Sequence, residues 1–199
     1  MVDARLLENA ARCYERANQP AEAARCYREI GAHRRSAELH MRMGNLREAA
    51  FDYAHSNQVH LAAWLLVHDC ADPVAARAVL AKDAVAATGA GPARPADLRR
   101  LAVTARCALA ERAPEAEVIA FLGEICADFR VFRPNHDGVV ETWCVEIAEV
   151  MRRDDQAQLI FAAAVSGRRR GARERWLAWG EKKFGMTLVL PDEERTRNG

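Results

Sequence analysis

The chain has 199 residues, of which 50% are hydrophobic and 29% are charged, and its formal net charge is +1. That apolar content can bury a substantial core, which excludes a largely disordered chain, and the near-zero charge excludes the strongly basic field of a general nucleic-acid binder. Alanine and arginine are abundant and β-branched residues are few, so the composition predicts an all-α protein.

The N-terminal part of the chain repeats every thirteen residues. The string AARCY occurs at residues 10–14 and again at 23–27, and the same offset gives small pairs at 36–37, 49–50, 62–63 and 75–76. Four residues after the first small residue comes a mostly large one on the same helical face. Eight residues after it, the copies carry Asn18, Gly31, Gly44, Asn57, Cys70 and Asp83. Glycine and asparagine accept the left-handed conformation that ends a helix.

Each copy is therefore predicted to form one helix of about nine or ten residues followed by a tight turn. Pro20 and Pro73 fall near predicted helix starts, where a missing N–H costs nothing. Helices this short need neighbours, and small pairs allow close approach while the large residue fills the space beside them. The prediction for residues 1–83 is an α-solenoid of short antiparallel helices.

This pattern resembles tetratricopeptide-type repeats and the related helical hairpins of trafficking and coat solenoids. The resemblance covers about residues 4–82, although two copies take 26 residues where that family takes about 34. It implies a non-enzymatic module that binds a protein partner, as an adaptor or a subunit of a larger assembly, and the composition favours a bacterial one. The residues that carry the resemblance are Ala24, Tyr27, Gly31, Ala37, Gly44, Ala50 and Tyr53.

The rest of the chain is predicted to form a second helical region. Glycines, prolines and small residues make 84–97 the expected linker. Residues 98–191 are expected to form a C-terminal domain of longer helices, either a compact bundle or a solenoid cap. Its last segment, MTLVLP at 186–191, is expected to be an extended strap, because one strand alone makes no sheet. Residues 192–199 are expected to be a polar tail.

A basic segment lies between Gly167 and Gly185, with seven bases against two acids. Arginine beside tryptophan is typical of protein-binding hot spots and also of nucleic-acid backbones with stacked bases. The alternative function is therefore a nucleic-acid-binding accessory protein, and a third reading places both tryptophans in the core with the arginines as a solvated rim. The candidate partner-binding residues are Arg168, Arg169, Arg170, Arg173, Arg175, Trp176 and Trp179.

An acidic stretch balances this segment. Residues 111–155 hold eleven acids and five bases, so the two stretches could face each other within one molecule or between molecules. An acidic neighbour would repel phosphate, which makes nucleic acid an unlikely partner compared with protein.

No motif in the sequence reaches the standard of a catalytic signature, so we predict no enzymatic activity. His136 and Asp137 lie in the loop RPNHDG, where a general base could be placed, but this loop is predicted to be a turn. Five of the six histidines lie between His33 and His68 without the tight spacing of a metal site, and we expect structural or surface roles for them.

Cofactor binding and membrane insertion are not expected either. The six cysteines show no C-x-x-C pair and are expected to be reduced core residues. No phosphate-binding loop is present, and no cofactor or metal is predicted. The apolar runs are too short to cross a bilayer and the opening residues do not read as a secretory signal, so we expect a cytoplasmic protein. The oligomeric state stays open.

Overall fold

The computed structural model describes residues 3–86, 95–131 and 138–185. Within these ranges the chain is helical and contains no strand, which confirms the all-α prediction. It divides into two compact units, Met1–Val118 and Ile119–Gly199. The helices are α1 (Ala4–Arg16), α2 (Pro20–Glu29), α3 (His33–Arg42), α4 (Leu46–His55), α5 (Val59–His68), α6 (Pro73–Ala86), α7 (Pro95–Ala110), α8 (Glu115–Phe129), α9 (Val139–Val150), α10 (Asp154–Ser166) and α11 (Ala172–Phe184).

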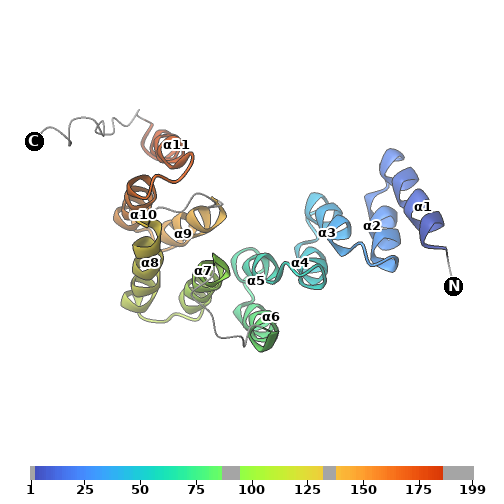
Figure 1. The fold of residues 1–199 in the computed structure, drawn as a ribbon, viewed down its shortest axis with the longest axis horizontal. Helices are drawn as coiled ribbons and strands as arrows, with labels where there is room; N and C mark the ends of the chain where they lie inside the picture. Colours follow the sequence, from blue (N-terminus) through green and yellow to red (C-terminus); the bar gives the residue numbers. More distant parts are fainter. Residues whose placement is uncertain (1–2, 87–94, 132–137, 186–199) are drawn as a thin grey trace, which may run out of the picture. The chain divides into compact units, whose positions relative to one another are not determined.

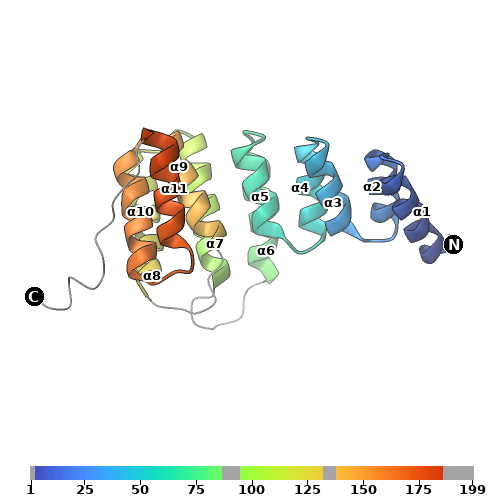
Figure 2. The same ribbon diagram turned by 90° about the horizontal axis from the view of Figure 1, so that it is seen from above.

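The thirteen-residue repeat appears directly in the first unit. Helices α2 to α5 each have 10 residues and begin at residues 20, 33, 46 and 59. Each of the helices α1 to α6 packs against the next one in the chain (Figures 1 and 2). Tight turns join them, so neighbouring helices run antiparallel. The solenoid of short helices is therefore confirmed.

Four helices end with the left-handed residue that the repeat predicts. Asn18, Gly31, Gly44 and Asn57 have φ values of 54°, 73°, 75° and 63°, all in the left-handed region. After α2, for example, the amide of Ala32 donates to the carbonyl of Tyr27 at 2.8 Å. This bond satisfies a helical carbonyl that would otherwise lack a partner.

The fifth and sixth copies differ from the predicted pattern. The left-handed residue after α5 is Ala71, with φ 53°, and not Cys70. The shift arises because Asp72 caps α6, accepting a hydrogen bond from the amide of Ala75 at 3.0 Å, and Pro73 then opens the helix. Helix α6 also continues to Ala86 instead of ending near Asp83. Alanine-rich sequence sustains a helix in the absence of a stop residue.

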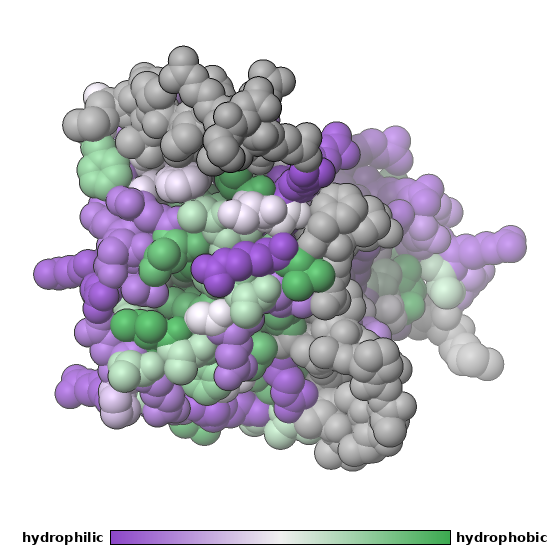
Figure 3. All heavy atoms as spheres, turned by 60° about the vertical axis from the view of Figure 1, so that its left-hand side comes forward, coloured by the Kyte–Doolittle hydropathy of each residue, from purple (hydrophilic) through white to green (hydrophobic). Residues whose placement is uncertain are grey.

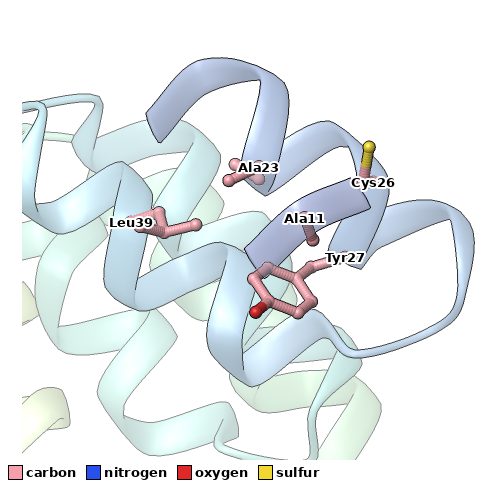
Figure 4. Close-up of a cluster of buried hydrophobic side chains, with 6 residues drawn as sticks. Ala11, Ala23, Cys26, Tyr27 and Leu39 are labelled. Carbon is pink, nitrogen blue, oxygen red and sulfur yellow. The ribbon is translucent and has the colours of Figure 1, made fainter. Parts of the chain in front are cut away.

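The core of the first unit follows the repeat positions. Both alanines of the second, fourth and fifth small pairs are at most 1% exposed. The large residue of a copy contacts the helices on either side: the Tyr27 hydroxyl donates to Glu15 of α1 at 2.9 Å, and Arg35 of α3 lies over the Tyr27 ring. Figure 4 shows this ring beside Ala11, Ala23 and Leu39. Alanine contacts and one bridging ring therefore hold three successive helices together.

The first unit extends beyond the predicted boundary. Helix α7 packs against α5 and α6, and Arg77 of α6 pairs with Glu111, just after α7, through two hydrogen bonds of 2.7 and 2.6 Å. The ends of the predicted linker, 84–86 and 95–97, are helical, and its central part lies outside the described residues. The division between the units thus comes after α7, within α8 between Val118 and Ile119.

Helices α9 to α11 of the second unit are longer than the ten-residue helices α2 to α5 but shorter than α6 and α7 of the first unit, which have 14 and 16 residues. Helices α9, α10 and α11 have 12, 13 and 13 residues, and α10 packs against both others. At the end of α10, a Cβ on Gly167 would lie 1.7 Å from the carbonyl oxygen of Phe129, so only glycine allows this approach to α8. The face shown in Figure 3 intersperses hydrophobic residues with hydrophilic ones. The expected strap at 186–191, the tail, and the pair His136 and Asp137 lie outside the described residues.

Candidate functional site

One buried carboxylate interrupts the apolar core of the repeat. Three residues after the first small residue, the second to fifth copies carry Cys26, Leu39, Asp52 and Leu65, and all four are buried. Asp52 is 0% exposed. A buried charge is costly unless it is paired and hydrogen-bonded. Unlike the apolar residues at this position in the other copies, Asp52 therefore requires neighbouring side chains that pair with its charge.

Asp52 receives hydrogen bonds from two other helices. Arg28 of α2 donates from Nε to Oδ1 and from Nη2 to Oδ2, both at 2.9 Å. From α3, Ser36 Oγ donates to Oδ2 at 2.6 Å and His33 Nδ1 lies 3.2 Å from Oδ1. Arg28 Nη2 also pairs with Glu48 at 2.8 Å, and His40 Nε2 lies 3.9 Å from Asp52 Oδ2. We call Arg28, His33, Ser36, His40, Glu48 and Asp52 the Asp52 cluster.

The cluster gathers three departures from the repeat. Asp52 stands where other copies have cysteine, leucine or alanine, Ser36 where the other five have alanine, and His40 where they have tyrosine, leucine or valine. Apolar groups in a buried ion pair's place are often neutral or stabilising. The neighbouring copies form the same helices without these polar groups. The fold of the repeat therefore does not require the Asp52 cluster, which makes it the candidate site.

The charge state of the cluster follows from its contacts. Burial acts to raise the pKa of Asp52, but hydrogen bonds from Arg28, Ser36 and His33 hold it below its ordinary value. The hydrogen bond with Asp52 raises the pKa of Arg28. Burial lowers the pKa of His40, and the positive charge of Arg28 lowers it further. At neutral pH the cluster thus contains an ionised Asp52, a charged Arg28 and a neutral His40.

Above the buried carboxylate lies a partly exposed aromatic surface. The Arg28 side chain is 34% exposed, and its guanidinium lies 5.3 Å from the centroid of the Phe51 ring. Phe51 is 50% exposed and packs on His55 with ring centroids 4.1 Å apart. His55 in turn lies 5.2 Å from the ring of His33. We call Arg28, His33, Glu48, Phe51 and His55 the Arg28–Phe51 surface.

The geometry of the cluster orients side chains and does not activate a nucleophile. Ser36 and His33 both bind the Asp52 carboxylate, so they do not form the serine-to-histidine-to-aspartate chain that generates an alkoxide. Ser36 is also fully buried. In the part of the chain that the structure describes, no group of three or more histidine, cysteine, aspartate or glutamate side chains is placed to hold a metal ion.

The predicted binding residues of the basic segment lie in different environments. Arg169 is 7% exposed and stacks over the Phe129 ring at 3.7 Å. Trp179 is buried and donates from Nε1 to Glu149 at 2.9 Å, and the half-buried Trp176 stacks against Phe161. Arg175 binds Glu141. Arg168, Arg170, Lys182 and Lys183 are exposed and Arg173 is half-buried, so these five present the segment's basic groups at the surface.

The acidic and basic stretches face each other within the second unit. Arg169 lies 3.9 Å from Asp128, Arg175 pairs with Glu141 at 2.7 Å, and Lys183 pairs with Asp154 at 2.9 Å. The charge asymmetry of the sequence is thus partly an internal complementarity between α11, the loop before it and the helices that precede them. It reduces the charge that the segment offers to a partner.

The cysteines are mostly core residues, as expected. Cys26, Cys107, Cys126 and Cys144 are buried free thiols, and burial raises the pKa of Cys107 and Cys126 to about 11. The expectation is wrong for Cys13, which is exposed. Cys13 occupies in α1 the position that neighbouring helices cover at Cys26 in α2, and no described helix covers it in α1.

The Asp52 cluster is not evident from its residues one at a time, because each is an ordinary helical residue by itself. Aligning the six copies position by position would have singled out Ser36, His40 and Asp52.

No described helix combines the length and apolar content that crossing a membrane requires. Comparisons with protein-family models, curated proteins and solved structures find no match.

Proposed function

We propose that this protein is a non-enzymatic helical-repeat module that binds a protein partner, as an adaptor or a subunit of a larger assembly. We further propose that the Arg28–Phe51 surface contacts that partner. The observation that carries the proposal is the placement of Phe51. At its repeat position Arg12, Arg25, Glu38 and Arg77 are charged and Trp64 is buried, whereas Phe51 is apolar and 50% exposed.

The composition of this surface suits protein recognition. Aromatic and arginine side chains carry much of the binding energy in protein interfaces, most of all when they become desolvated at the centre. Arg28 is held by two bonds to a buried carboxylate and a third to Glu48. A guanidinium fixed in this way loses little conformational entropy on binding. The buried Asp52 therefore contributes by positioning a surface arginine beside Phe51.

Affinity capture from the native cell, with variants, tests the proposal. Tagged wild type is compared with Phe51→Ala and with Val74→Ala, which truncates a 76% exposed side chain of α6 elsewhere in the first unit. We expect at least one protein to be retained by wild type and Val74→Ala but lost from Phe51→Ala. Circular dichroism verifies that all three fold alike. The same set of proteins on all three would overturn the assignment of this surface.

A further inference from the structure

His40 occupies an unusual environment at the centre of the Asp52 cluster. Its side chain is 13% exposed, and Nε2 lies 3.3 Å from Arg28 Nη2. A guanidinium can only donate hydrogen bonds, so this contact requires an unprotonated Nε2 and places the proton on Nδ1. Nδ1 is buried and has no hydrogen-bond partner among the described residues. The contacts of His40 therefore favour the neutral imidazole over the protonated form.

The charged groups around His40 come from both adjacent helices. Arg28 faces it from α2, while Glu48 and Asp52 face it from α4. On α3 itself, His33 binds the other oxygen of Asp52, Oδ1. A proton on His40 Nε2 would point an N–H at the Arg28 guanidinium. The two cations would then compete for one oxygen, Asp52 Oδ2, which Arg28 Nη2 already binds at 2.9 Å.

We propose that protonation of His40 releases Arg28 from its position beside Phe51 and so makes partner binding at the Arg28–Phe51 surface sensitive to pH. This inference rests on the function proposed above. Arg28 links the two sites directly, because the same guanidinium that contacts His40 also lies over Phe51. Neutral His40 accepts from Arg28 and supports its position, whereas the protonated form repels it.

The first test follows the ring signals of His40 and Phe51 by nuclear magnetic resonance across a pH titration. The His40 signal is assigned by its loss in His40→Gln. We expect a His40 midpoint below the ordinary value of 6.5, with the Phe51 ring signals shifting at the same midpoint. In His40→Gln that Phe51 shift disappears. The proposal is overturned by a His40 midpoint at or above 6.5, or by Phe51 ring signals that do not shift at the His40 midpoint.

A matched control separates His40 from the other histidine beside the ring. His55 packs directly on Phe51, so its ring also contributes to the Phe51 signals. The His55→Gln variant removes that contribution, and the shift that follows His40 is expected to persist in it. Its loss in His55→Gln, with retention in His40→Gln, would assign the effect to His55 and overturn the proposal.

The second test measures release of the captured partner. At a pH below the His40 midpoint found in the titration, wild type is expected to lose the protein that it retains at about pH 7.5, while His40→Gln keeps it. Equal loss from both overturns the proposal. The titration needs no partner, so its result stands apart from that of the capture experiment. Failure of capture alone therefore counts against the proposed surface, and failure of the titration counts against His40.

Discussion

Arg175 of α11 donates two hydrogen bonds to the carboxylate of Glu141 in α9, at 2.8 and 2.7 Å. The Glu141 side chain is buried, whereas that of Arg175 is about one third exposed. The contact joins the first turns of two helices that lie far apart in the sequence. An arginine that sequence analysis offers as a binding residue thus holds the second unit together.

Replacing Arg175 with methionine is expected to destabilise the second unit by about 3 kcal/mol, because it leaves a buried carboxylate without its cation. Urea unfolding followed by circular dichroism measures the change. Arg170→Met is the control, since Arg170 is exposed, and is expected to change stability by less than about 0.5 kcal/mol. Equal effects from both variants would contradict the structural role of Arg175.

A double-mutant cycle tests whether the Asp52 cluster serves stability. Arg28→Met alone leaves the buried Asp52 with its contacts to Ser36 and His33 but without its arginine, at an expected cost of about 3–5 kcal/mol. Adding Asp52→Leu restores the residue type found at this position in α3 and α5. The double variant is expected to recover most of the loss in urea unfolding. A double variant as unstable as Arg28→Met would show that the fold itself requires the carboxylate.

The lowered pKa of Asp52 predicts acid sensitivity. The unfolded chain takes up the proton near the ordinary value of 3.8, before the folded protein does, so stability is lost progressively as the pH falls from that value through the lower pKa of folded Asp52. The variant Arg28→Met/Asp52→Leu lacks this group and is expected to lose less stability below about pH 4 than wild type. Unfolding free energies measured at several pH values check this. Parallel profiles would contradict the assignment.

The left-handed turn residues predict stabilising substitutions. Arg152, after α9, has φ 58°, a conformation that costs a non-glycine residue about 1–2 kcal/mol. Arg152→Gly removes this strain but loosens the unfolded chain, for a net gain of about 0.5–1 kcal/mol. Met151→Gly is the control at a position with φ −72°, and is expected to be destabilising. Thermal unfolding distinguishes the two; a lower melting temperature for Arg152→Gly would count against the prediction.

The nucleic-acid alternative makes a separate prediction. Trp179 is buried, Arg169 and Arg175 are engaged internally, and Lys183 pairs with Asp154, so among the described residues of the segment Arg168, Arg170, Arg173 and Lys182 are the remaining surface basic groups. We expect no oligonucleotide binding at about 50 mM salt in a fluorescence anisotropy titration. Binding that weakens steeply towards about 200 mM salt, and that disappears when Arg168 and Arg170 become glutamate, would favour that alternative.

The sequence predicts the solenoid because its signals are local. A small pair, a large residue and a glycine or asparagine recur in order, and each acts within one helix and its turn. The same helix ending recurs after α7, α9 and α10 with Arg112, Arg152 and Arg168 in the left-handed conformation. Arginine is not a residue type that indicates a left-handed turn, so the sequence does not predict these three helix ends.

The candidate site was harder to predict because it depends on contacts between helices. Arg28 and Asp52 are 24 positions apart, and their pairing follows from the packing of α2 on α3 and of α3 on α4. Trp179 illustrates the same dependence: a tryptophan near arginines is compatible with a binding surface or with the core, and packing on Phe161 places this one in the core. Both cases turn on tertiary burial, which periodicity constrains only in part.

The similar turns that join α2 to α5 also restrict how such a chain can grow. Each thirteen-residue copy reverses the direction of the backbone, so duplicating a single copy would invert every helix downstream of the insertion. Duplicating two adjacent copies would restore the original direction and add one complete hairpin. Natural length variants of this protein are therefore expected to differ by even numbers of copies.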